Sequence, residues 1–153
     1  MKMKKILLEQ LGNSITVVIL TLAMIQSINN SIIKEDEFSI IFGGLWAVFV
    51  VWMIIFGIIR YIYSRKDKGY DRKKGELSFQ DEREKMIGKK STKITYVVLI
   101  NILLMFFVFF FFFSGFILDI KLLKIVTISL LGISVIIAYI TYLISWLILD
   151  YKY

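Results

Sequence analysis

Four stretches of the chain contain no charged side chain, and each is long enough to cross a lipid bilayer as a helix. They cover residues 10–33, 38–59, 94–118 and 125–149. A spanning helix needs about 20 apolar residues for a hydrocarbon core of about 30 Å, whereas a helix on a soluble protein carries charges along its outward face. We therefore expect an all-α integral membrane protein, a four-helix bundle made of two antiparallel transmembrane hairpins. It should form a single membrane domain over residues 1–153, with spans at about 10–33, 38–63, 94–118 and 125–149.

Charged residues are distributed unevenly between these spans, and their distribution predicts an orientation. The net charge is +2 over residues 1–9, −2 over residues 34–37 and +6 over residues 60–93. Short loops rich in Lys and Arg stay on the cytoplasmic side of a membrane. We therefore expect a multi-pass protein of the cell (plasma) membrane, with the loop 64–93 and both termini in the cytoplasm.

The residue types that the chain lacks limit its chemistry. It contains no cysteine, no histidine and no proline. Disulfides, thiolate nucleophiles, imidazole acid–base catalysis and the usual zinc or haem sites are therefore excluded. We expect no catalytic site, no metal site and no cofactor.

The loop before the third span contains a predicted helix start. Ser78 and Asp81 have the spacing of a capping box, in which the two side chains bond backbone N–H groups of the first turn. Asp81, Glu82 and Glu84 place negative charge where the helix dipole favours it. We expect this helix to continue through Gly88 into the third span without a break.

Small and weakly polar residues form one stripe on the first span and another on the fourth. Helices in lipid associate through small residues and side-chain hydrogen bonds, because burying apolar surface does not favour helix association in an apolar solvent. We interpret the stripes as helix-packing seams, and Asn101 as a residue that bonds across helices. The seam residues are Asn13, Thr16, Ala23 and Ser27 in the first span, and Thr127, Ser134, Ala138, Thr141 and Ser145 in the fourth.

Glu9 is the acidic residue nearest to a span, and it bears on the alternative that the stripes form a polar pathway. Ion and proton routes usually contain a charged residue inside the membrane. Glu9 lies one position outside the first charge-free stretch, beside Lys4 and Lys5. We interpret it as an interfacial residue rather than a proton carrier.

Residues 81–96 combine alternating charges with lysines beside the third span. One interpretation is a solvated helix start whose lysines attract anionic lipid headgroups, by about 1 kcal/mol per basic residue. The other is a docking site, either for the ends of other helices or for a cytosolic protein. Nucleic acid is not an expected partner, because the basic residues are interleaved with acids. The candidate docking residues are Asp81, Glu82, Arg83, Ile87 and Lys90.

The same segment resembles a motif of small bacterial and archaeal four-span membrane proteins of unknown function. In that motif Asp-Glu-Arg precedes the third span, followed by Ile, a basic residue, a small residue, and Thr or Ala before an aromatic residue. The resemblance implies the four-span arrangement and no activity, since the family has none that is established. The matching positions are Asp81, Glu82, Arg83, Ile87, Lys90, Ser91, Thr95 and Tyr96.

These patterns favour a non-enzymatic integral membrane protein that acts by contact. It would be an accessory, regulatory or immunity-type subunit that binds a partner in the membrane or at its inner surface through the loop 64–93. The alternative is a small oligomeric transporter or pore, with a path along the polar stripes. A membrane enzyme ranks third, because Asp81, Glu82 and Glu84 lie too close to Lys and Arg to act as poised acids.

Overall fold

Four long helices make up most of the fold, as the charge-free stretches predicted. The computed structural model describes residues 2–33, 38–39, 41–67, 69–71, 73–79, 81–114 and 119–152. Each of the four helices is long and apolar enough to cross a membrane. They are α1 (Lys2–Asn30), α2 (Leu45–Lys66), α3 (Glu82–Ser114) and α4 (Ile120–Lys152).

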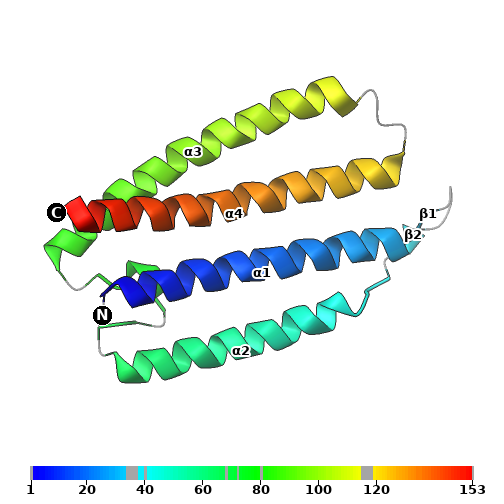
Figure 1. Cartoon of the computed structure of the whole chain (residues 1–153). Coiled ribbons are helices and arrows are strands. Elements are labelled where there is room, and N and C mark those ends of the chain that lie inside the picture. Colours follow the sequence, from blue (N-terminus) through cyan, green and yellow to red (C-terminus); the bar gives the residue numbers. More distant parts are fainter. Residues whose placement is uncertain are drawn as a thin grey trace.

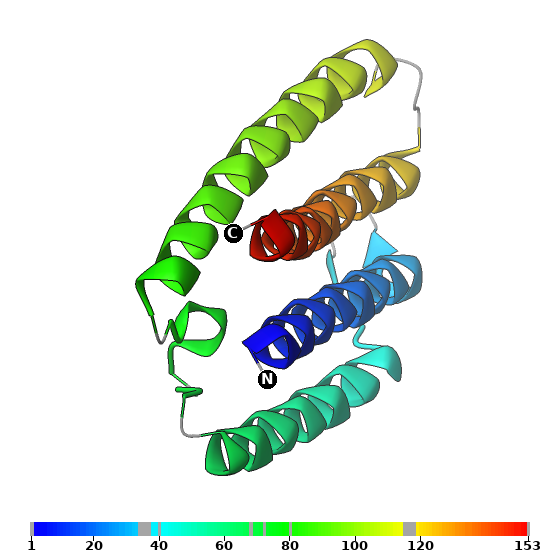
Figure 2. The same cartoon turned by 60° about the vertical axis from the view of Figure 1, so that its left-hand side comes forward.

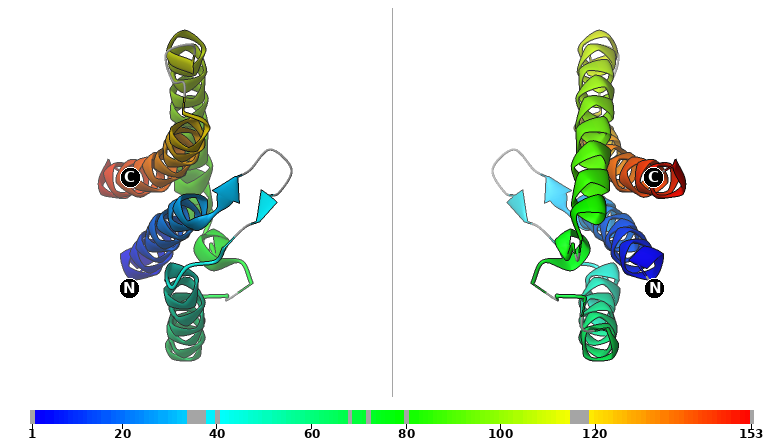
Figure 3. Two further views of the ribbon diagram at one scale, coloured as in Figure 1. Left: turned by 90° about the vertical axis from the view of Figure 1, so that its right-hand side faces the viewer. Right: turned by 90° about the vertical axis from the view of Figure 1, so that its left-hand side faces the viewer.

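The helices lie side by side in one layer, in the order α2, α1, α4, α3 (Figures 1 and 2). Each of the two hairpins, α1 with α2 and α3 with α4, is antiparallel, and the hairpins meet where α1 packs against α4. Views along the layer place α2 and α3 at its opposite edges (Figure 3). Among the described residues, α1 and α4 therefore have two extensive helix contacts each, whereas α2 and α3 have one.

The first connection differs from the predicted spans. Helix α1 ends at Asn30, and the strands β1 (Ile32–Ile33) and β2 (Phe38–Ser39) pair in antiparallel register before α2 begins at Leu45. The pairing of Ile32 with Ser39 and of Ile33 with Phe38 requires extended backbone at both isoleucines, so the helix does not continue to residue 33. Residues 34–37, the acidic turn, lie outside the described residues.

Gln26 of α1 determines where α2 starts. Its Oε1 accepts a hydrogen bond of 2.9 Å from the backbone N–H of Leu45, which has no partner within its own helix. Gly43 permits this approach, because a Cβ there would lie 2.2 Å from the Gln26 amide carbon. The second helix thus starts on a side chain of the first, seven residues later than the charge-free stretch (38–59) suggested.

Helix α3 runs from the loop into its apolar segment without a break, as predicted, but its capping residue is different. The Oδ1 of Asp81 accepts a 2.7 Å hydrogen bond from the backbone N–H of Glu84. The Ser78 hydroxyl instead bonds the backbone of Asp71, as a donor to its carbonyl and an acceptor from its N–H. The prediction that Ser78 caps this helix was wrong because its side chain is used to fold the preceding loop.

Polar residues of α1 take part in the seam with α2. The indole Nε1 of Trp52 donates to the Thr16 hydroxyl at 2.9 Å, and that of Trp46 donates to the Ser27 hydroxyl at 2.7 Å. Phe56 stacks on Trp52 and lies so close to Gly12 that a Cβ there would be 2.1 Å from the ring. Two predicted seam residues therefore serve as acceptors for tryptophans.

The seam between α1 and α4 depends on a close approach at Gly132. A Cβ on Gly132 would lie 2.3 Å from the Thr21 hydroxyl, so only glycine fits. Of the predicted seam residues, Ala23, Ser134 and Ser145 are buried, and Asn13, Thr127, Ala138 and Thr141 are half-buried. Within the chain, the prediction that Asn101 bonds across helices was wrong. Asn101 is exposed, and its amide donates to the Val97 carbonyl of the same helix.

Candidate functional site

Charged residues gather at one end of the layer, which we call the loop end. It contains both ends of the described chain, the short helix η1 (Gly75–Leu77) and the start of α3 (Figure 1). Three charged side chains there, Lys5, Glu9 and Glu84, are buried. Buried charges are costly unless they are paired and hydrogen-bonded, so their partners are informative.

Lys5 and Glu84 form a buried ion pair that joins α1 to α3. The Lys5 Nζ lies 2.9 Å from Glu84 Oε2, and the two side chains are only 2% and 3% exposed. The same ammonium donates to the Ser78 carbonyl at 2.6 Å. Since α1 and α3 are not neighbours in the layer, this pair and the loop beside it connect helices that otherwise do not pack extensively.

Glu9 forms a second buried group with α2 and the loop. Arg60 donates from Nε to Glu9 Oε1 at 2.8 Å, and the Tyr70 hydroxyl donates to the same carboxylate oxygen. Burial raises the pKa of Tyr70 to about 12, so its hydroxyl stays protonated and available as a donor at neutral pH. The partners of Glu9 are therefore Arg60 and Tyr70, and its interpretation as an interfacial residue rather than a proton carrier stays a prediction.

Gly75 lets the loop approach this group. Its φ of +53° lies in the left-handed region that glycine adopts at little cost. A Cβ at this position would lie 3.0 Å from the Arg60 guanidinium and 3.3 Å from the Glu9 carboxyl. The turn at Gly75 thus closes the loop directly over the ion pair.

An apolar cluster lies beside the ion pairs. Ile6 of α1, Ile87 of α3, and Tyr142 and Trp146 of α4 are buried against one another. Ile87 was predicted as a docking residue, but the structure buries it completely, so it cannot contact a partner. Although Ile87 lies within the charged segment, its side chain is part of the apolar core of the loop end.

Arg83 bonds the end of α4. Its Nη2 donates to the Asp150 carbonyl at 2.6 Å and lies 3.0 Å from the Asp150 carboxylate. A cation is favoured near a helix C-terminus because the carbonyls there carry partial negative charge. Of the two kinds of docking considered, Arg83 therefore binds the end of another helix, within its own chain.

The other candidate docking residues lie on an exposed surface, which we call the loop-end surface. Two shallow grooves cross it, of about 410 and 370 Å³, and Glu82 and Lys85 line both. Leu77 in the first groove is 53% exposed and Met86 in the second is 40% exposed. The remaining lining residues are Phe79 and Asp81 in the first groove, and Lys89 and Lys90 in the second.

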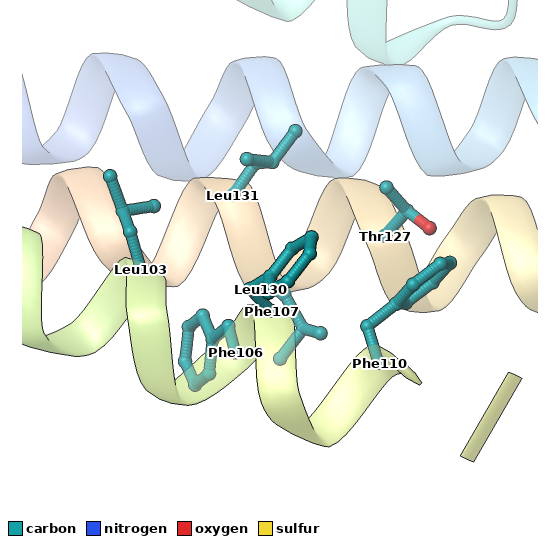
Figure 4. Close-up of a pocket in the computed structure, with 7 residues that line it drawn as sticks. All are labelled: Leu103, Phe106, Phe107, Phe110, Thr127, Leu130 and Leu131. Carbon is teal, nitrogen blue, oxygen red and sulfur yellow. The ribbon is translucent and has the colours of Figure 1, made fainter. Parts of the chain in front are cut away.

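A further pocket of about 220 Å³ lies between α3 and α4, away from these charges (Figure 4). Its lining is almost wholly apolar, and the hydroxyl of Thr127 donates to the Leu123 carbonyl of its own helix. Such a pocket offers nothing to orient a polar solute. It is lined by Leu103, Phe106, Phe107, Phe110, Thr127, Leu130 and Leu131.

Within the described ranges, no group of three or more acidic side chains lies close enough together to hold a metal ion. The buried carboxylates instead bond cations and hydroxyls of the chain itself, as at Glu9 and Glu84. Their arrangement is therefore suited to fixing the loop against the helices. Comparisons with protein-family models, with curated proteins and with solved structures gave no match.

The sequence contained a signal for one of the two ion pairs of Lys5 and Glu9, neither of which was predicted. Glu9 is the last charge before the first charge-free stretch, and Arg60 is the first charge after the second. An antiparallel hairpin of two similar spans brings those two positions together. The pair of Lys5 and Glu84 had no such signal, because it depends on how the two hairpins meet.

Proposed function

We propose that the chain is an integral protein of the cell membrane that acts by binding a protein partner at its loop-end surface. Both termini and this surface would lie in the cytoplasm, since the loop carries most of the basic residues. The protein would be an accessory, regulatory or immunity-type subunit, without catalytic activity of its own.

The observation that carries this proposal is the exposure of Leu77 and Met86 on a surface whose loop is hydrogen-bonded to buried charged residues. A loop that only connects two spans needs no buried ion pairs, because pairing charges inside a protein carries a large desolvation penalty. Here Lys5 and Glu9, each in an ion pair between helices, also bind the loop through the Ser78 carbonyl and the Tyr70 hydroxyl, while Leu77 and Met86 remain in grooves open to solvent. Such preorganised apolar anchors with a charged rim are typical of protein interfaces.

The chemistry of the grooves indicates the kind of partner. Acidic Asp81 and Glu82 line one groove, and basic Lys89 and Lys90 line the other. A fitting segment therefore has apolar side chains that enter the grooves, and carries both signs of charge. An amphipathic helix laid across the two grooves has this composition.

The alternative, a small transporter or pore, has less support. A polar pathway needs side chains available to a solute, but Thr16 and Ser27 already accept from tryptophans and Glu9 already binds Arg60 and Tyr70. These groups act in packing, which favours the contact proposal.

Site-specific photo-cross-linking in native membranes tests the proposal. A photoreactive residue at Met86 should capture one defined protein, whereas the same residue at Ile120, which is 60% exposed at the opposite end, should not capture it. Leu77→Glu should abolish co-purification of that protein, and Ile120→Glu should not. Capture of the same protein from both positions, or solute flux in liposomes containing the purified chain alone, would contradict the proposal.

A further inference from the structure

One face of α3 is exposed along most of the apolar part of the helix. Helix α3 lies at an edge of the layer, where α4 is its only extensive neighbour among the described residues (Figure 3). Leu99 and Phe106, which line pockets shared with α4, are half-buried, whereas the face about 180° away from them is open. We call the residues of this open face, which are spaced alternately three and four apart, the α3 seam: Ile94, Val97, Asn101, Leu104, Val108 and Phe111.

The spacing of the α3 seam is that of a heptad repeat, in which the first and fourth positions of every seven form the contact between two helices. Branched residues at the first position favour a parallel pair of helices, and a single Asn among them fixes the register and the number of helices. Here Ile94 and Val108 flank Asn101 at the first position, and every fourth position is apolar. The five apolar residues of the seam are between 42% and 73% exposed, so no helix of the chain covers them.

Asn101 places an amide on a face that lipid would otherwise surround. It lies seven residues after Ile94, about 10 Å into the charge-free stretch 94–118, which contains no other Asn or Gln. Its Nδ2 donates to the Val97 carbonyl at 2.7 Å, which leaves one amide hydrogen and the side-chain oxygen without a partner in the described part of the chain. Lipid chains can bond neither group, and an unpaired polar group in hydrocarbon is costly. A helix with a matching polar group therefore covers this face better than lipid does.

We infer that two copies of this chain pair in parallel along the α3 seam, with the two Asn101 amides bonded to each other. Copies inserted in the same direction are related by a two-fold axis along the membrane normal, which places each seam residue opposite its own counterpart. An amide is both donor and acceptor, so two identical amides are complementary, and side-chain hydrogen bonds of this kind join helices in lipid. A different membrane protein would need a polar residue at the same depth, whereas a second copy has one by symmetry.

The inference rests on the membrane embedding proposed above, and it is independent of the loop-end partner. The α3 seam begins at Ile94, beyond the last residue of the loop-end surface, Lys90. The two interfaces therefore use different residues, and either proposal can fail without the other.

Disulfide cross-linking tests the α3 seam, because the chain has no cysteine of its own. In membranes isolated from cells that produce the full chain, Leu104→Cys should form a disulfide-linked dimer under mild oxidation, since residues at the fourth position meet their counterparts in a parallel pair. Ile54→Cys is the matched control, because Ile54 is also 58% exposed but lies on α2, at the opposite edge of the layer. It should cross-link at least about tenfold more slowly, because its thiols would meet only by collision.

Replacing the amide provides a second measurement. Energy transfer between copies labelled at Lys152→Cys, an exposed position, reports the dimer dissociation constant in phosphatidylcholine vesicles. Asn101→Leu should raise this constant about tenfold, because it removes the hydrogen bond and keeps the seam apolar. Asn13→Leu, the same change on α1, should leave it within about twofold, and tryptophan fluorescence should show that both variants remain folded.

Equal cross-linking of Leu104→Cys and Ile54→Cys, or an unchanged dissociation constant in Asn101→Leu, would overturn the inference while leaving the partner proposal intact. A chain that stays folded in water without detergent would overturn the membrane embedding as well.

Discussion

Separating Lys5 from Glu84 should be among the most damaging changes to this protein. Both side chains are almost fully buried, and the Lys5 ammonium also bonds the Ser78 carbonyl. Removing one member of a buried pair leaves the other charge without compensation, at a cost of about 3–5 kcal/mol. We expect Lys5→Met and Glu84→Met each to lower the free energy of unfolding by about that amount.

A double variant separates the effect of breaking the ion pair from the effect of changing the size of the side chains. With both charges replaced by methionine, neither partner is left as an uncompensated charge, and the Ser78 carbonyl loses its donor, which costs about 1–3 kcal/mol. The double variant should therefore be more stable than either single variant. Lys4→Met, at an exposed neighbouring position, should change stability by less than about 0.5 kcal/mol.

Unfolding by increasing mole fractions of a denaturing detergent, followed by tryptophan fluorescence and circular dichroism, measures these differences. A loss of less than about 1 kcal/mol in either single variant, the value for an exposed pair, would show that burial does not strengthen this pair. Losses of the two single variants that simply add in the double variant would show that the two side chains are not coupled.

Three further predictions use the seams, the loop and the orientation. Gly132→Ala should destabilise the chain by about 1–3 kcal/mol in the same unfolding assay. Adding Thr21→Ala should restore most of the lost stability, because it removes the hydroxyl that the new methyl group would meet. Gly57→Ala serves as control, since a Cβ there would have nothing within 4 Å. The pKa of Tyr70 is raised to about 12 from an ordinary 10.0, so the stability that the Tyr70 hydroxyl contributes should be full below pH 10 and should disappear as the pH rises through 12. An unfolding series in alkaline buffers should show this loss of stability in the wild type, and Tyr70→Phe should lack it. Cysteine introduced at Lys121 should react with an impermeant thiol reagent added outside intact cells, whereas cysteine at Lys74 should not, and the reverse result would invert the proposed orientation.

The helices could be predicted from the sequence because their signals are local. A stretch without charges and a continuous helix through Gly88 depend on residues close together in the chain, and both predictions agree with the structure. The start of α2 could not be predicted in this way. It depends on Gln26, which lies 19 residues earlier on another helix.

Which helices lie next to one another could also not be predicted from the sequence. The stripe on α1 showed that Thr16 and Ser27 would be used in packing, but tryptophans of α2 determine which helix they bond. The Asn101 amide bonds within its own helix rather than across helices of the chain, because it can reach the Val97 carbonyl one turn back. The buried pair of Lys5 and Glu84 required the order of all four helices.

The order α2, α1, α4, α3 has a consequence for how the protein is made. Of the four helices, α1 comes first along the chain and α4 comes last, so the seam at Gly132 can form only when synthesis of α4 is complete. Until then α1 has α2 as its neighbouring helix in the layer, and its opposite face lacks the helix that covers it in the complete fold. Assembly of the layer is therefore governed by the arrival of its final helix, and a chain halted before α4 would leave α1 exposed along the length of that seam.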